Sequence, residues 1–284
     1  MVSTPLFPEI VRGVQPPAAY IGGKRKLARA ICRAIDRVPH RSYCEVFLGM
    51  GGVFLRRTRT PSVEIVNDWS EDVSTLFRIL QRHYVAFLDM LRYQLSTRAG
   101  FERLLKVDPG TQTDLERAAR FLYLQRLSFG GKVSGRSFGV DPYGPSGFDL
   151  TKLVPLLEAI HERLAPVTIE RLPWNQFIAR YDTAETLFYL DPPYFGSESD
   201  YGKDLFDRAQ FPEMAAQLGG IAGRFLLSLN DHPEVRRIFA AFAMVELDVT
   251  YTVGGGEKAQ HARELVISNL DQAALERAIA ETRI

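Results

Sequence analysis

Residues 43–52, with the sequence YCEVFLGMGG, join an apolar segment to a glycine-rich one. The apolar part, residues 43–47, predicts a buried strand, and the glycines that follow end it and let a ligand approach the backbone closely. A second apolar segment, residues 63–66, runs into Asp68. A strand, a glycine loop, a second strand and an acid are typical of an α/β nucleotide-binding sheet. Asp68 is then expected to accept hydrogen bonds from ribose hydroxyls or to cap the following helix.

The same alternation returns in the carboxyl-terminal half. Strands are expected at residues 167–171, 186–190 and 225–229, and helices at 175–181, 208–220 and 233–241. Two further strands, residues 244–253 and 264–269, follow each other without a helix between them. This arrangement predicts an antiparallel hairpin at the end of the sheet.

The middle of the chain interrupts this pattern. Residues 97–129 are helical in pattern, 130–147 are rich in glycine and proline and predict a loop or hairpin, and 148–164 return to helix. We therefore expect a mainly helical insertion at residues 85–165. The catalytic α/β domain would comprise residues 1–84 and 166–284, and a helix over residues 22–37 would precede its first strand.

Composition bounds the class of protein. The chain has 284 residues, of which 46% are hydrophobic and 24% are charged, an ordinary globular balance. Its two cysteines, Cys32 and Cys44, suggest reduced buried thiols in a cytoplasmic protein rather than a disulfide framework or a zinc cluster. We find no signal-peptide pattern and no apolar run long enough to span a membrane.

Local charge points to nucleic acid more than the net charge of +1 does. One basic group follows residue 23, and a second comprises Arg117, Arg120, Arg126, Lys132 and Arg136. Such groups indicate either a surface for phosphates or simply solvated helix faces.

Asp191-Pro192-Pro193-Tyr194 follows the expected strand 186–190. Paired prolines cannot donate to a sheet ladder, so the strand must end there and leave Asp191 at its carboxyl end. A carboxylate and a rigid proline carbonyl can accept both hydrogens of an aromatic amine, while Tyr194 can stack on its ring. The motif indicates amine chemistry without a metal, although a proline-rich turn is the alternative for so short a match.

In their order along the chain, these motifs resemble the Dam-like, D12-class DNA adenine methyltransferases, from about Tyr20 to Asn269. The matching segments are Tyr20-Ile21-Gly22-Gly23-Lys24, Phe47-Leu48-Gly49-Met50-Gly51, Asp68, the insertion, and Asp191 to Tyr194. The resemblance implies a Rossmann-like S-adenosylmethionine-dependent methyltransferase sheet with a helical target-recognition insertion and an antiparallel C-terminal hairpin.

The resemblance also implies cofactor contacts. Tyr20 and Lys24 are expected at the methionine end of S-adenosylmethionine, with Lys24 paired to its carboxylate. Trp174 is expected to pack on the cofactor adenine, an ordinary core tryptophan being the alternative. The residues implied at the cofactor are Tyr20, Gly22, Gly23, Lys24, Glu45, Phe47, Gly49, Gly51, Asp68, Trp174 and Asp191.

For DNA, the resemblance implies four contacts. Arg126 would meet a phosphate, Phe129 would wedge beside the flipped base, and Lys132 and Arg136 would reach phosphates or base edges. Phe129 at the end of a helix could instead be a packed residue.

The implied function is site-specific methyl transfer from S-adenosylmethionine to the N6 amino group of an adenine flipped out of double-stranded DNA, without a metal. Asp191, Pro192, Pro193 and Tyr194 would be the catalytic residues. A bacterial or phage enzyme fits this function, whether it belongs to a restriction-modification system, a phage or a host regulatory circuit. The same fold acting on the cytosine N4 amino group, on RNA or on a protein amide is the alternative. A non-catalytic DNA-binding module and a nicotinamide oxidoreductase are other classes, but the latter leaves the paired prolines unexplained.

Overall fold

The computed structural model describes residues 9–20, 22, 24, 27–140, 144–198, 206–252 and 259–280. Within these ranges, one sheet of seven strands has the order β5-β4-β2-β6-β7-β9-β8. Its strands are β2 (Ser42–Glu45), β4 (Val63–Asn67), β5 (Thr168–Glu170), β6 (Thr186–Leu190), β7 (Arg224–Asn230), β8 (Ala243–Thr252) and β9 (Ala259–Ser268).

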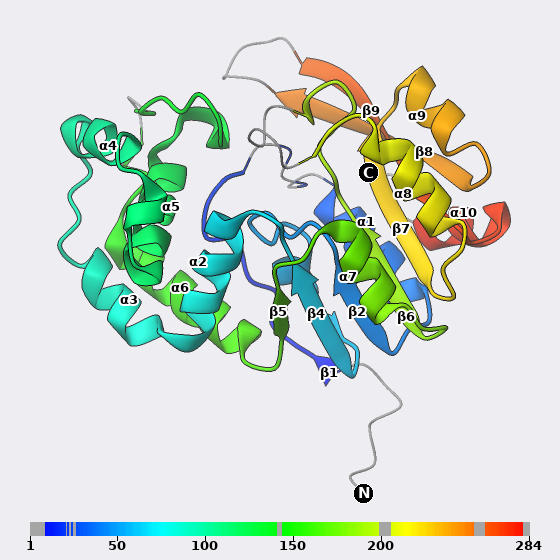
Figure 1. The fold of residues 1–284 in the computed structure, drawn as a ribbon, viewed down its shortest axis with the longest axis horizontal. Helices are drawn as coiled ribbons and strands as arrows, with labels where there is room; N and C mark the ends of the chain where they lie inside the picture. The colour runs from blue at the N-terminus through cyan, green and yellow to red at the C-terminus, as the bar shows by residue number, and fades with distance from the viewer. Residues whose placement is uncertain are drawn as a thin grey trace, which may run out of the picture.

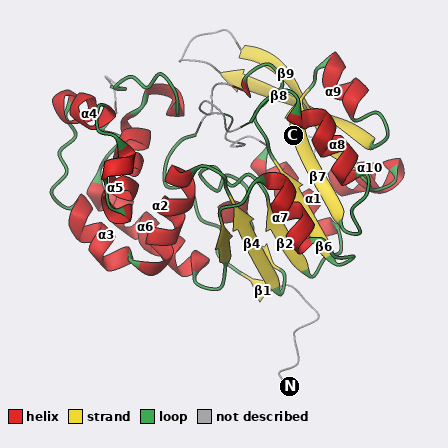
Figure 2. Ribbon diagram, in the orientation of Figure 1, coloured by secondary structure: helices red, strands yellow, loops and turns green. Residues whose placement is uncertain are grey.

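Helices flank this sheet and also gather beside it, as Figures 1 and 2 show. Those that accompany the sheet are α1 (Ala28–Arg37), α7 (Trp174–Tyr181), α8 (Gln210–Leu218), α9 (Pro233–Ile238) and α10 (Gln272–Ile279). The group beside it consists of α2 (Glu71–Arg82), α3 (Tyr84–Leu91), α4 (Arg98–Leu105), α5 (Asp114–Leu127) and α6 (Leu150–Leu164).

The strand pairing confirms the expected α/β fold. β5, β4, β2, β6 and β7 run parallel, whereas β9 is antiparallel to both β7 and β8, which is the predicted hairpin. From β2 the chain continues to β4 and β5 and then returns to β6 on the other side of β2. The order therefore reverses between β2 and β6, and the crevice at the carboxyl ends of these strands is where such sheets bind ligands.

Alternation along the strands gives the sheet two apolar faces. Tyr43 and Leu187 belong to one buried core, which includes α1 and α10, and this core continues into helices α2 to α6. Cys44 and Phe188, one position further on, belong to a second core beneath α7, α8 and α9. Because side chains of a strand alternate between faces, the apolar run in β6 can fill both cores.

The helices beside the sheet pack around α5. Helix α2 contacts both α5 and α6, while α3 and α4 also contact α5. A capping box begins α5, because the Thr113 hydroxyl accepts from the Glu116 backbone N–H and the Glu116 carboxylate accepts from the Thr113 N–H. After α5, an isolated antiparallel bridge joins Ser128 to Phe138 and closes the loop. The division at residues 85 and 165 stays a prediction.

One expectation about the amino-terminal part is wrong, and one feature of it was not predicted. The helix expected from residue 22 begins at Ala28, because Gly22 has a φ of 68°, a left-handed conformation that a right-handed helix excludes. In addition, β1 (Glu9–Ile10) and β3 (Arg59–Thr60) form a small separate antiparallel sheet that the sequence pattern did not indicate.

Candidate active site

A cavity of about 460 Å³ opens at the carboxyl ends of the central strands. Three acids line it from three neighbouring strands: Glu45 ends β2, Asp68 follows β4 and Asp191 follows β6. The lining also contains six other residues that the sequence predicted, namely Tyr20, Gly22, Lys24, Phe47, Gly49 and the motif proline Pro193. The sheet thus brings together segments that lie far apart in the sequence. Gly23, also expected here, lies outside the described residues.

The glycine loop is fixed to both neighbouring strands. The Leu48 N–H donates to the Asn67 carbonyl at 2.9 Å, and the Val46 N–H donates to the Tyr189 carbonyl at 3.0 Å. Gly49 has a φ of 52°, and a Cβ there would lie 3.2 Å from the Tyr20 ring. Glycine therefore permits both the backbone turn and the close approach of Tyr20.

Asp68 connects this loop to the start of α2. One carboxylate oxygen accepts from the Gly49 N–H at 2.8 Å, and the other accepts from the Ser70 N–H at 2.9 Å. Burial raises the pKa of Asp68 to about 6, although the backbone N–H groups oppose this shift. Ser70, not Asp68, is the N-cap residue of α2. Because a carboxylate has about four acceptor sites, two bonds leave capacity for a ligand hydroxyl.

Asp191 lies within a compact charged cluster. Its Oδ1 is 3.0 Å from the Lys24 Nζ and accepts from the Ser228 hydroxyl at 3.2 Å. No described residue donates to Oδ2, and the side chain is 20% exposed, toward the cavity. Burial raises the pKa of Asp191 to about 6, and Lys24 opposes this shift while the negative charge of Glu264 adds to it. One oxygen of the carboxylate is thus anchored, and the other remains for a ligand.

Lys24 is buried at the centre of this cluster. Its ammonium donates to the Glu264 carboxylate at 2.8 Å and to the Tyr194 hydroxyl at 2.7 Å, in addition to its ion pair with Asp191. Burial alone would lower the pKa of Lys24, but the two carboxylates outweigh it and leave the pKa above its usual value. The expected pairing of Lys24 with a cofactor carboxylate therefore has a competitor, since protein acceptors already surround the ammonium.

Glu264 is a residue of this cluster that sequence reasoning missed. It lies in β9, is buried, and accepts a hydrogen bond from the Tyr194 hydroxyl as well as from Lys24. The sequence did contain one indication of it. A glutamate stands directly before the apolar residues 265–267 of an expected strand, and buried strand positions are usually apolar. The distance of 240 residues from Lys24 concealed the pairing.

The Asp191–Tyr194 motif is held from the neighbouring strand. Asn230, at the end of β7, accepts from the Phe195 N–H at 2.9 Å and donates to the Phe195 carbonyl at 3.1 Å. Pro192 and Pro193 are buried, and Tyr194 is partly exposed. The segment after β6 is therefore clamped at its far end by Asn230 and at its start by the contact between Ser228 and Asp191.

Trp174 does not belong to the lining of this cavity among the described residues. It is buried in the core beneath α7, and its indole N–H donates to the Gln210 side chain at 2.8 Å. The alternative of a core tryptophan therefore describes it better. The tryptophan in the lining is Trp69, which is 40% exposed, and Phe206 lines the cavity in edge contact with Phe47.

Three of the residues expected to contact DNA differ in whether their side chains are exposed or bonded within the protein. Phe129 is 63% exposed, so the alternative of a packed residue is wrong for it. Lys132 is exposed as well. Arg126 instead donates to the carbonyls of Gly147 at 2.6 Å and Pro17 at 3.1 Å, and it lines the cavity.

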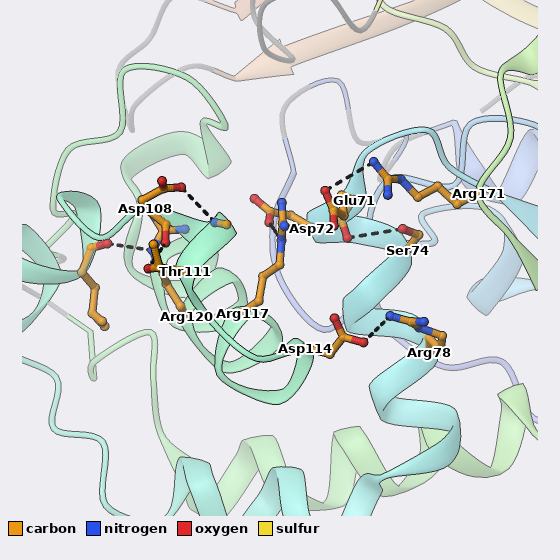
Figure 3. A network of polar contacts seen from close by, with 12 residues as sticks. Glu71, Asp72, Ser74, Arg78, Asp108, Thr111, Asp114, Arg117, Arg120 and Arg171 are labelled. Atoms are coloured by element: carbon orange, nitrogen blue, oxygen red, sulfur yellow. Dashed lines mark hydrogen bonds and ion pairs between the residues drawn. The ribbon is translucent and has the colours of Figure 1, made fainter.

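The remaining basic residues of the insertion have internal partners. Arg136 donates to the Gln125 side chain at 3.0 Å. In Figure 3, Arg117 points from α5 to the start of α2, where it pairs with Asp72 at 2.6 Å and with Glu71 at 3.1 Å. Arg120 is buried and donates to the Leu104 carbonyl. Much of this basic group therefore stabilises the packing of helices.

Two other features are absent from the described part of the chain. It contains no cluster of three or more His, Cys, Asp or Glu side chains arranged to hold a metal ion. It also contains no helix with the length and apolarity needed to cross a bilayer.

Comparison with known proteins agrees with the geometry. The sequence pattern of the D12 class N6 adenine-specific DNA methyltransferases matches residues 20–253, which is most of the chain. A relative described as type II methyltransferase M1.LlaDCHI, from Lactococcus lactis subsp. cremoris, is 23% identical over 279 residues. That alignment covers 90% of this chain and 95% of the relative. The chain belongs to the D12 class of N6 adenine-specific DNA methyltransferases, enzymes that methylate adenine in DNA.

Proposed function

We propose that this enzyme binds S-adenosylmethionine in the cavity and transfers its methyl group to an adenine amine held by Asp191. The observation that carries the proposal is the Asp191 carboxylate, which has one anchored oxygen and one oxygen left for a ligand, in the same cavity as Asp68. S-adenosylmethionine supplies a methyl group on a sulfonium, which is already a good leaving group.

The cavity suits this cofactor in size and in its donor set. Its volume of about 460 Å³ lies within the ordinary range of small-ligand pockets, about 300 to 1,000 Å³. The Asp68 carboxylate keeps acceptor sites for two ribose hydroxyls, and the aromatic rings of Phe47, Trp69 and Phe206 offer faces for an adenine. The Asp68 and Asp191 carboxylates in the lining favour a cationic sulfonium.

The methionine carboxylate requires a cation in the lining. Lys24 is surrounded by Asp191 and Glu264, and Arg126 donates to backbone carbonyls. Arg56 also lines the cavity, and it likewise donates to a backbone carbonyl, that of Gly52, and to the Gln15 side chain. A methionine carboxylate bound at any of these three cations would therefore share it with its present partners.

In the proposed mechanism, the target adenine leaves the base stack, at a cost of a few kcal/mol. Tyr194 stacks on the extruded ring. Asp191 Oδ2 and the Pro192 carbonyl accept the two amine hydrogens and orient the nitrogen lone pair toward the methyl group. Methyl transfer would break the methyl–sulfur bond, form the N–methyl bond and release S-adenosylhomocysteine, and the amine would then lose one proton to water. Because the nitrogen gains positive charge before that proton leaves, the nearby carboxylates stabilise it, so catalysis depends on positioning and electrostatics. Pro193 stiffens the turn that presents these groups.

For DNA, we propose that the helical segment 85–165 recognises the duplex, while residues 1–84 and 166–284 form the catalytic unit. Exposed Phe129 wedges beside the flipped base, and Lys132 contacts a phosphate. Arg126 and Arg136 must exchange an internal hydrogen bond to reach DNA, so we expect smaller contributions from them. The relative's description as a type II methyltransferase supports a site-specific enzyme of a restriction-modification system.

The test is methyl transfer from labelled S-adenosylmethionine into mixed-sequence duplex DNA, followed by mass spectrometry of the nucleosides. N6-methyladenine from the wild type, with none from Asp191→Ala that still binds cofactor, supports the proposal. Equal loss of cofactor binding and transfer in Asp191→Ala contradicts the role of this residue. Methyl on the cytosine amine, or label only in RNA, overturns the assignment of the substrate.

A further inference from the structure

We propose that Glu264 is a positioning residue of the methyl-transfer site, where it holds the Tyr194 hydroxyl and the Lys24 ammonium in place beside Asp191. This inference rests on the proposed function of Asp191 and Tyr194. It concerns a side chain that the matched motifs do not contain.

The geometry begins with the C-terminal hairpin. Glu264 in β9 is the register partner of Asn230 in β7, and Asn230 clamps the backbone of Phe195 directly after the catalytic motif. The motif is therefore held by neighbouring strands on one side of the sheet: β7 fixes its backbone, and β9 supplies a carboxylate to the Tyr194 side chain. An aromatic plate tied at its hydroxyl has less freedom to tilt away from a stacked base.

Each oxygen of the Glu264 carboxylate has its own partner. Oε1 accepts from the Tyr194 hydroxyl, and Oε2 accepts from the Lys24 ammonium at 2.8 Å. The same ammonium is 3.0 Å from Asp191 Oδ1. Glu264 thus acts on the reacting carboxylate through Lys24 and on the stacking ring through Tyr194, while its own side chain is only 1% exposed.

The charges of the cluster argue against a purely structural role for Glu264. One carboxylate would suffice to neutralise the buried Lys24, and burying a second one has a desolvation cost. The other acid nearby, Glu45, has a pKa that burial raises to about 8, so it is mostly uncharged at neutral pH. Asp191, Glu264 and Lys24 together then carry one net negative charge. Such a charge favours the positive charge that develops on the amine during methyl transfer.

The first variant is Glu264→Gln, which keeps the shape of the side chain but removes its charge and one acceptor. We expect a roughly 10- to 100-fold lower kcat, the size that follows the loss of one hydrogen bond to a charged group. KM for S-adenosylmethionine should stay near the wild-type value, because Glu264 is not part of the described cavity lining.

A pH profile separates this role from loss of structure. Glu264 helps to raise the pKa of Asp191, so the acid limb of kcat/KM should move to lower pH in Glu264→Gln. The other groups that face Asp191 remain in the variant: the Lys24 ammonium, the Ser228 and Tyr189 hydroxyls, and the Glu45 carboxyl.

Three further variants complete the experiment. Glu264→Asp keeps the charge and should restore the acid limb and part of kcat. Glu246→Gln removes a carboxylate from the same hairpin that pairs with Arg236 at the surface, so it should behave as the wild type. Should Glu264→Gln not fold, Tyr194→Phe removes the hydroxyl that Glu264 holds and keeps the ring. A reduced kcat with unchanged cofactor KM is expected there.

An unchanged kcat and acid limb in folded Glu264→Gln, or a wild-type kcat in Tyr194→Phe, overturns the inference. These results are distinguishable from failure of the proposed function. If the wild type itself forms no N6-methyladenine, the function is overturned. If the wild type methylates adenine and the variants match it, only the role of Glu264 is overturned.

Discussion

Replacement of Lys24 by methionine should have two effects. It should destabilise the folded enzyme, and it should impair Asp191, the carboxylate that we propose accepts a hydrogen bond from the adenine amine. Lys24 is 1% exposed and is the shared partner of Glu264 and Asp191. Removal of one member of a buried ion pair costs about 3 to 5 kcal/mol, since the other charge stays buried without compensation. Asp191 keeps 20% exposure and a hydrogen bond from Ser228, so we expect the lower part of this range. At about 2 to 4 °C per kcal/mol, Tm should fall by roughly 6 to 12 °C.

The destabilisation should depend on pH in a defined direction. Lys24 lowers the pKa of Asp191, which is about 6 with the lysine present, so the pKa must rise in Lys24→Met. A carboxyl whose pKa is higher in the folded than in the unfolded protein destabilises the fold above the folded pKa, and this loss diminishes as pH falls. Tm of Lys24→Met should therefore lie furthest below the wild type near pH 8 and approach it near pH 5.

Thermal unfolding by calorimetry at these two pH values provides the measurement. Lys152→Met is the matched control, because it removes a lysine from an exposed pair with Asp149, which contributes little. Lys24→Met combined with Asp191→Asn should recover part of the lost stability, since the second substitution removes the uncompensated charge. A Tm of Lys24→Met within the variation of the control, or a larger loss at pH 5 than at pH 8, would refute this reasoning.

Three further predictions address ligand binding and catalysis. In the wild type, kcat/KM should fall as pH drops through about 6, where the Asp191 carboxylate takes up a proton; a profile flat to pH 5 contradicts its role as the acceptor. Asp68→Ala should weaken S-adenosylmethionine binding roughly 10- to 100-fold by calorimetric titration, because hydrogen bonds to a charged group are lost, and unchanged affinity would exclude the ribose contact. Phe129→Ala should reduce methylation of duplex DNA and leave cofactor affinity intact, since Phe129 is 63% exposed and lies outside the described cavity lining; an unaffected rate would rule out the wedge.

Local pattern predicted those parts of the fold in which sequence neighbours determine the structure. The strand expected at residues 186–190 is β6, because an apolar run stopped by two prolines has well-defined ends. The hairpin of β8 and β9 followed from two consecutive strand patterns without a helix. The start of α1 could not be predicted in this way. The burial of Lys24 depends on its contacts with Asp191 and Glu264, which lie far along the chain.

Site residues that the fold alone places could be predicted from the sequence, whereas those that depend on side-chain packing could not. Glu45, Asp68 and Asp191 each lie at or directly after the end of a parallel strand, so the fold alone places them at one edge of the sheet. Trp174 and Trp69 were not distinguishable by position, since each lies near the end of a strand of the same sheet. Packing decides between them: the indole of Trp174 is enclosed beside Gln210, and that of Trp69 remains in the cavity lining.

The contacts of α5 link the helices beside the sheet to the wall of the cavity. The Gln125 amide donates to the carbonyls of Ala19 and Gly131 at 2.8 and 2.7 Å, and Arg126 donates to the Pro17 carbonyl. A Cβ at Gly131 would lie 2.9 Å from the backbone of Tyr20, so glycine is required for this approach. Because Tyr20 lines the cavity, the amino-terminal segment that forms part of the cavity wall is bonded to the helix that leads to Phe129. Displacement of one must break hydrogen bonds of the other, so the cavity wall at residues 17–20 and the helix that leads to Phe129 form a single packed unit.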